Sequence, residues 1–243
     1  MTATTNPRQA IIGLVAFAAA EEQMLLAAAR PDEPGDAANW AALPLIAHNA
    51  EFRRQQAERL AAITSGQTPV EYPEIDHSSS QVYGRYLALP ADQVAVEASA
   101  SASDLISNLS RISDDDLRDP ARNPWLKGRQ LWLQIIVRGF WHPAGHLADY
   151  YLARSQPDRA VALASHAVTT ASYVDAPAPA RGMALYNLAC AQSRTGDLDQ
   201  AAATVESAIG LNSDLRVNAS RDPDLQALRD SGRLALSAAG STG

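Results

Sequence analysis

Cysteine is almost absent from this chain of 243 residues, in which Cys190 is the single example. One cysteine cannot form an internal disulfide, and this scarcity of cysteine fits a reducing compartment. Lysine and arginine are also scarce, 20 residues against 27 Asp and Glu, and they form no cluster suited to a phosphate backbone. We therefore expect an acidic protein, with a formal net charge of −7, that does not bind nucleic acid.

Runs of alternating Val and Ile are nearly missing as well, and with them the usual signature of β-strands. Alanine and leucine dominate in patterns of helical period, which predict an all-α protein. The N-terminus lacks the basic start and the small-residue cleavage site of a secretory signal. Its apolar run, Ala10 to Ala20, passes directly into Glu21 and Glu22 and indicates an amphipathic core helix. We expect a cytoplasmic protein with no segment long enough to span a bilayer.

The order of helices follows from apolar periodicity and from the turn-forming residues that interrupt it. The second helix starts at Asp36 or Asn39, or nearer Leu43 because a proline follows it. Its charged half, Glu51 to Arg59, is expected to face solvent. A link over about 64–82 is unusually long for a compact domain, which is often a sign of function. The other expected elements are helices over 7–30, 81–87, about 91–112, 128–154, 158–173 and near 222–228, with an acidic capping turn at 113–117.

The C-terminal third carries the pattern of a helical hairpin. Counted from Gly182, its small and apolar positions resemble the 34-residue tetratricopeptide repeat of two antiparallel helices. The matching residues are Leu185, Leu188, Ala189, Gly196, Ala201 and Ala208. A single repeat is too short for a free-standing solenoid, which needs about three. We therefore expect a four-helix bundle over 1–154 and a helical extension over 157–243 that packs on the bundle or on a second subunit, with a homodimer as the simplest assembly.

Two of the five histidines, His142 and His146, are four residues apart and would share one face of a helix. A metal site needs at least a third ligand, for which His48 in another long helix is the candidate. Three neutral imidazoles with one open position form the ligand set of a catalytic zinc-type site, and imidazole also suits nickel, copper and iron. Pro143 predicts a kink that would either spoil or tune the shared face. The alternative is three ordinary histidines with satisfied hydrogen bonds.

Several segments around these histidines resemble the DinB/YfiT-like superfamily of metal-binding bundles and, within it, the ClbS/DfsB branch. The segments are Trp40–Phe52 (WAALPLIAHNAEF), Asp114–Leu117 and Trp125–His146 (WLKGRQLWLQIIVRGFWHPAGH). The resemblance covers about residues 8–154 and implies an up-down-down-up bundle with the three histidines at one end of its core. It also implies thiol-dependent transfer with bacillithiol or mycothiol, or hydrolysis of a reactive cyclopropane. Pro143 inside the histidine motif and Asn49 after His48 depart from the family pattern.

The favoured hypothesis is an enzyme in which a divalent metal, zinc or nickel, activates water or a low-molecular-weight thiol against a small electrophile. A reactive natural product would be such an electrophile, and the role would then be detoxification or self-resistance. Glu51 is the candidate general base, with Glu22 as the alternative. The candidate substrate-binding residues are Trp125, Arg129 and Trp141. The two tryptophans could equally belong to the core, and Arg129 could instead bind the acidic turn near Asp116.

Two other hypotheses stay open, a metal-free bundle that sequesters an apolar ligand and an interaction protein that uses the repeat-like C-terminus. Cys190 lies at a small-residue position and is interpreted as buried packing. His166 is expected at the surface. His77 and Tyr83 lie on the long link, which could cover the mouth of the bundle, and His77 is expected to be solvated.

Overall fold

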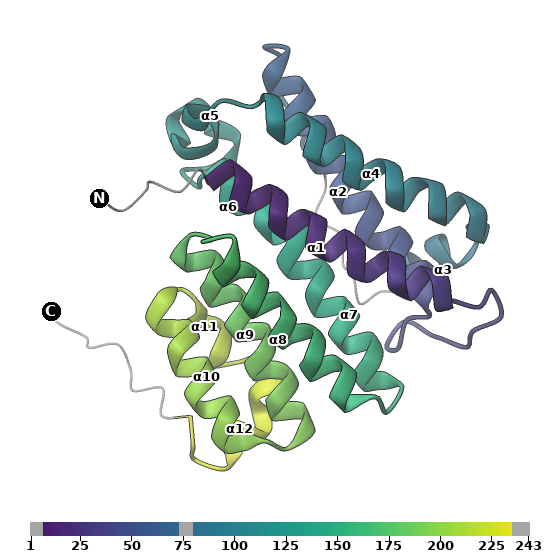
Figure 1. The fold of residues 1–243 in the computed structure, drawn as a ribbon, viewed down its shortest axis with the longest axis vertical. Helices are drawn as coiled ribbons and strands as arrows, with labels where there is room; N and C mark the ends of the chain where they lie inside the picture. The colour runs from purple at the N-terminus through teal and green to yellow at the C-terminus, as the bar shows by residue number, and fades with distance from the viewer. Residues whose placement is uncertain (1–6, 73–79, 235–243) are drawn as a thin grey trace, which may run out of the picture.

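The computed structural model describes residues 7–72 and 80–234, and the described chain contains helices and no strand (Figure 1). The all-α prediction is therefore confirmed. The α-helices are α1 (Pro7–Ala28), α2 (Ala42–Thr64), α3 (Ser80–Leu87), α4 (Ala91–Arg111), α5 (Asp114–Arg118), α6 (Leu131–Ile136), α7 (His142–Ala153), α8 (Pro157–Tyr173), α9 (Ala178–Thr195), α10 (Leu198–Leu211), α11 (Leu215–Ala219) and α12 (Gln226–Asp230). Short 3₁₀ turns lie at η1 (Pro120–Arg122), η2 (Pro124–Leu126) and η4 (Pro223–Leu225), and a π-helical turn, η3 (Val137–Trp141), joins α6 to α7.

Two neighbouring hydrophobic clusters form the core between α1, α2, α4 and the rod made of α6, η3 and α7. In Figure 1, α1 crosses the middle of the molecule, with α2 and α4 on one side and α8 on the other. The cluster that contains α1 and α6 continues into Ala167 and Ala171 of α8 and into Met183 and Ala184 of α9. The apolar contacts therefore cross the predicted boundary between residues 154 and 157, so the C-terminal helices are packed against the rest of the chain.

Helix α1 is long and apolar enough to cross a bilayer by length and composition alone. The expectation that no segment reaches this length is wrong on that criterion. In the structure half of its most apolar 18-residue window is buried. Ile11, Leu14 and Val15 are completely buried against other helices, and Glu22 on the same helix is sealed inside the protein. Helix α1 is thus a central core element of this fold.

The second half of α2 does not face solvent as predicted, although Arg54 and Glu58 do. Arg53 is completely buried and donates two hydrogen bonds to Glu22 of α1, Nη1 to Oε1 at 2.8 Å and Nη2 to Oε2 at 2.5 Å. Its Nε donates a third, of 3.3 Å, to Ser101 Oγ of α4. The charged residues of this segment predicted a solvent-exposed helix face, because charged side chains are rarely buried. A carboxylate that binds both Nη atoms makes the burial of Arg53 feasible.

The segment predicted as one helix over 128–154 consists of α6, the π-helical turn η3 and α7, and it begins only at Leu131. The N–H of His142 bonds to the carbonyl of Val137, five residues earlier. Pro143 falls in the first turn of α7, where a missing N–H is tolerated. The kink predicted from Pro143 is thus a π-helical turn placed before the two histidines.

The C-terminal helices form a compact unit against α7. Helix α9 is capped by Gly196, whose φ of +89° suits a residue without a side chain, and the Asp197 side chain caps α10. Helices α9 and α10 pack against each other, α8 packs between α9 and α7, and η4 packs on α9. This arrangement brings α9 and η4, which are distant in sequence from α7, to the side of α7 that carries His142 and His146.

Candidate metal centre and adjoining cavity

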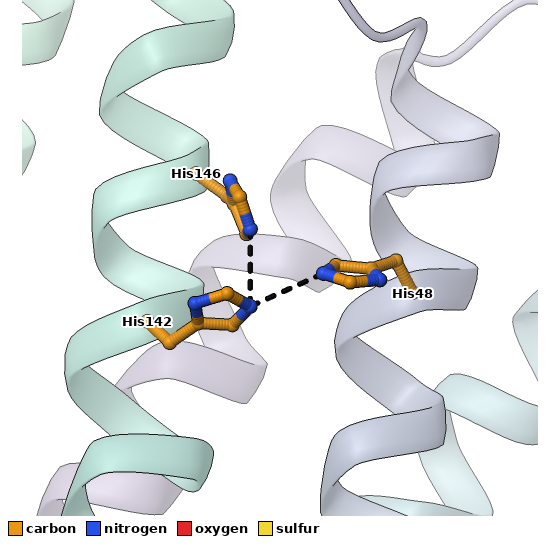
Figure 2. Close-up of side chains that lie close together, drawn as sticks. All are labelled: His48, His142 and His146. Carbon is orange, nitrogen blue, oxygen red and sulfur yellow. Dashed lines mark hydrogen bonds between the residues drawn. The ribbon is translucent and has the colours of Figure 1, made fainter. Parts of the chain in front are cut away.

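Three imidazoles converge where α2 and α7 face each other (Figure 2). His48 comes from α2, and His142 and His146 come from successive turns of α7. The Nε2 atom of His142 lies 3.1 Å from Nε2 of His48 and 3.0 Å from Nε2 of His146. His48 is almost completely buried, while His142 and His146 are half-buried. The structure therefore brings together the three residues predicted as ligands, and the shared helix face of the α7 pair is retained.

The spacing of these nitrogens suits one small divalent ion. Zn–N bonds of 2.0–2.1 Å in tetrahedral geometry place two ligand nitrogens about 3.3 Å apart. The observed separations of 3.0 and 3.1 Å need only a slight opening of the triad, and one ligand atom from each histidine lies within 4.8 Å of the others. The three histidines could therefore hold a metal ion, with a fourth position left for water or substrate.

Aromatic rings enclose the triad on the side of α2. The Trp40 ring is stacked on His146, with centroids 6.5 Å apart and planes at 12°, and meets His48 edge-on at 5.0 Å. Phe52 contacts His48 at 4.7 Å and His142 at 5.0 Å between centroids. These contacts hold the ring orientations of the triad.

On the open side, the triad faces a cavity of about 200 Å³ between α7 and the C-terminal helices. The α7 side contributes Trp141, His142, His146 and Asp149, and the C-terminal side contributes Tyr186, Asn187, Cys190, Arg194, Asp222 and Asp224. A neighbouring cavity of about 510 Å³ shares His146, Asp149, Arg194 and Asp224 and is also lined by Trp40, Leu45 and Tyr150. The two cavities therefore meet beside His146, and together they connect the triad to both halves of the chain.

Arg194 of α9 is the only Lys or Arg among the described residues that line these two cavities. Its Nη1 hydrogen-bonds to Asp149 Oδ1 and lies 3.5 Å from Asp224 Oδ1. Partial loss of hydration in the cavity wall, with Asp224 and Asp222 nearby, raises the pKa of Asp149, although Arg194 acts in the opposite direction and about half of the side chain stays exposed. Burial also raises the pKa of Asp224, against the effect of Arg194. The carboxylates thus outnumber the cation available to them.

Cys190 lies on the same wall with only 9% of its surface exposed, so its prediction as a buried residue is confirmed. Burial, and then the charges of Asp222 and Asp224, raise the pKa of the Cys190 thiol well above its usual value. Tyr186 donates a hydrogen bond of 2.8 Å to Asp222 Oδ2. Because the thiol is held protonated by these surroundings, it is a poor nucleophile.

The structure does not bring Glu51 to the cavity beside the triad. Glu51 lines a separate cavity of about 410 Å³ on the other side of α2 and accepts hydrogen bonds from Tyr86 and, at 3.1 Å, from Gln55. The Tyr86 ring lies between Glu51 and His48, and its centroid is 5.4 Å from that of the His48 imidazole. Glu22, the alternative base, is occupied by Arg53.

Of the three candidate substrate-binding residues, only Trp141 lines the cavity beside the triad. Trp125 packs against the main core. The guanidinium carbon of Arg59 lies over the Trp125 ring, 5.3 Å from the ring centroid. Arg129 is exposed, and its Nε donates a hydrogen bond of 3.4 Å to the Leu126 carbonyl. The bond from Arg129 to the acidic turn is also absent among the described contacts, because Arg122 binds Asp116 at 3.0 Å.

The remaining titratable candidates do not line the cavity beside the triad. His166 is exposed, as predicted, and its Nδ1 lies 3.1 Å from Glu21 Oε1. Tyr83 is buried in α3 against Trp40, at 5.2 Å between centroids, so it forms part of the wall behind the triad. His77 lies outside the described residues, and so does the C-terminal tail.

Sequence reasoning missed most of the cavity wall. Asp149 follows His146 by three residues on the same helix, so helical spacing could have pointed to it. Tyr186, Arg194, Asp222 and Asp224 come from segments that only tertiary packing places beside α7, and no local pattern marks them.

Comparison with known proteins gave no relative: no family model, curated protein or solved structure matches the chain.

Proposed function

We propose that this chain is a metal-dependent enzyme of the DinB-like kind, a four-helix bundle with a tetratricopeptide-like C-terminal hairpin. His48, His142 and His146 would hold one divalent ion, zinc or nickel, and the substrate would be a small electrophile. The observation that carries the proposal is the convergence of three imidazole nitrogens, 3.0 and 3.1 Å apart, beside a cavity. A bound ion of this type lowers the pKa of water or ionises a thiol, and so supplies a nucleophile at neutral pH.

The protein groups around the triad would do the rest of the chemistry. Trp40 and Phe52 would orient the imidazoles. Asp149 replaces Glu51 as the candidate general base, since it lines the cavity beside His146 and about half of its side chain stays exposed, although it is paired with Arg194. Trp141 forms an apolar wall for the substrate. A low-molecular-weight thiol of the mycothiol or bacillithiol type would use the same open position as water.

Elemental analysis of protein purified without a histidine tag tests the metal. We expect about one equivalent of zinc or nickel in the wild type and loss of that ion in the His48→Ala, His142→Ala and His146→Ala variants. His166→Ala is the matched control, because that imidazole is exposed and remote from the cavity, and it should retain the ion. If the wild type holds no divalent ion and the triple variant binds added Zn²⁺ as tightly as the wild type, the proposal fails.

A panel of epoxides, activated esters and activated cyclopropanes, with and without a low-molecular-weight thiol, tests the reaction. We expect turnover that a chelator abolishes and added Zn²⁺ or Ni²⁺ restores. Product mass separates addition of water from addition of the thiol. Tryptophan fluorescence that responds to an apolar ligand while the metal content stays blank would favour the metal-free binding protein instead.

A further inference from the structure

We propose that the C-terminal wall of the cavity is a subsite for a protonated amine on the substrate, built from Cys190, Asp222 and Asp224. The inference rests on the proposed function, because it assumes that the reacting end of the same substrate lies at the histidine triad. It would make the C-terminal helices a specificity element, in addition to a packing partner of the bundle.

The first observation is a charge imbalance. Three carboxylates line the cavity, from Asp149, Asp222 and Asp224, against the single guanidinium of Arg194. Arg194 is shared between Asp149, to which it is hydrogen-bonded, and Asp224, whose Oδ1 lies 3.5 Å away. One cation thus serves two carboxylates, and Asp222 on the C-terminal wall has no ion pair among the described contacts. A carboxylate wall attracts cationic groups and repels anionic ones.

The second observation is the position of Cys190. Its side chain is nine-tenths buried, lines the cavity, and has no hydrogen-bond partner among the contacts of the described residues. The Cys190 Sγ atom and one carboxylate oxygen from each of Asp222 and Asp224 lie within 4.8 Å of one another. Three acceptor atoms from three side chains thus surround one point, and an alkylammonium group carries three N–H donors.

The same three atoms suit a second metal ion less well. Asp222 already accepts hydrogen bonds from the Tyr186 hydroxyl at 2.8 Å and from the Asp224 N–H at 3.0 Å. Burial and the nearby carboxylates also raise the pKa of the Cys190 thiol, so a metal would have to displace the thiol proton before it could bind the sulfur. An ammonium group needs no deprotonation of the site, so it is the cation that these surroundings favour.

Calorimetric titration of the full chain with benzylamine, benzyl alcohol and benzoate tests the subsite, since the three share a shape and differ in charge. We expect benzylamine to bind about tenfold tighter than benzyl alcohol, benzoate not to bind, and added NaCl to weaken only the amine. Asp224→Asn should remove this preference. Asp214→Asn is the control, because it makes the same charge change at an exposed position outside the cavity.

Two further measurements separate the possible failures. His142→Ala should still prefer benzylamine, because the subsite lies on the opposite wall, so loss of the metal site alone leaves the inference standing. Equal binding of benzylamine and benzyl alcohol by the wild type would overturn it, and that test does not depend on any variant folding. If Asp224→Asn instead releases one equivalent of metal beyond the ion held by the triad, the site is a second metal site and the amine proposal is wrong.

Discussion

Replacing Arg53 by methionine should be among the most destabilising single substitutions in this chain. The side chains of Arg53 and Glu22 are 0% and 1% exposed, so the substitution leaves a carboxylate buried without its partner. Breaking a buried ion pair in this way costs about 3–5 kcal/mol. The buried amides of Asn49 and Gln56 lie one turn away on α2 and have no hydrogen-bond partner. Because they could rotate towards Glu22, we expect a loss near the lower end, about 3 kcal/mol.

Urea denaturation followed by circular dichroism measures this loss, and for a chain of this size the melting temperature should fall by roughly 6–12 °C. Arg54→Met is the matched control on the next residue, where the pair with Glu58 is about half exposed, and it should cost less than about 1 kcal/mol. The double variant Glu22→Leu with Arg53→Met should recover most of the stability, because no unpaired charge remains. If Arg53→Met costs no more than Arg54→Met, the reasoning from burial is refuted.

Three other perturbations test the packing and the site. Gly139→Ala should lower the free energy of unfolding, measured by urea denaturation, by about 1–3 kcal/mol, because the added Cβ would lie 3.0 Å from a side chain of α1. Gly210→Ala, with open space around it, should raise the free energy of unfolding by about 0.5–1 kcal/mol. Cu²⁺ should quench tryptophan fluorescence much less in Trp40→Phe than in the wild type, since the indole is stacked on His146. Pro143→Ala should keep metal affinity within about threefold of the wild type, because the turns after Pro143 are already regular helix. A larger loss of affinity in a metal titration would contradict the conclusion that the π-helical turn lies before the histidines.

Local pattern was sufficient to predict several helix ends and the pair of histidines on α7. The start of α1 at Pro7, the cap at Ser113 and the i, i+4 spacing of His142 and His146 all depend on residues close in sequence, and the structure reproduces each. His48 was harder, because it lies 94 residues from His142. It was found because a metal site needs a third ligand and few histidines were available.

The burial of Arg53 could not be read from the sequence in the same way. A run of charged residues usually marks a solvated helix face, and only the bidentate contact with Glu22, 31 residues earlier, reverses that expectation. The residues of the cavity wall could not be predicted from the sequence for a related reason. Arg194 and Asp224 are ordinary surface-type residues in sequence, and their relation to His146 arises only when α9 and η4 pack beside α7.

The expected conflict between Pro143 and the histidine pair is resolved by the position of the π-helical turn. Turn η3 widens the helix by one residue before His142, whose N–H reaches back five residues to Val137. Pro143 then occupies a first-turn position of α7, where it removes no bond that the helix needs. Both histidines therefore lie within one regular helix and keep their shared face. The extra residue instead sets the rotation of α7 relative to α6, and that rotation determines whether the pair faces His48 on α2.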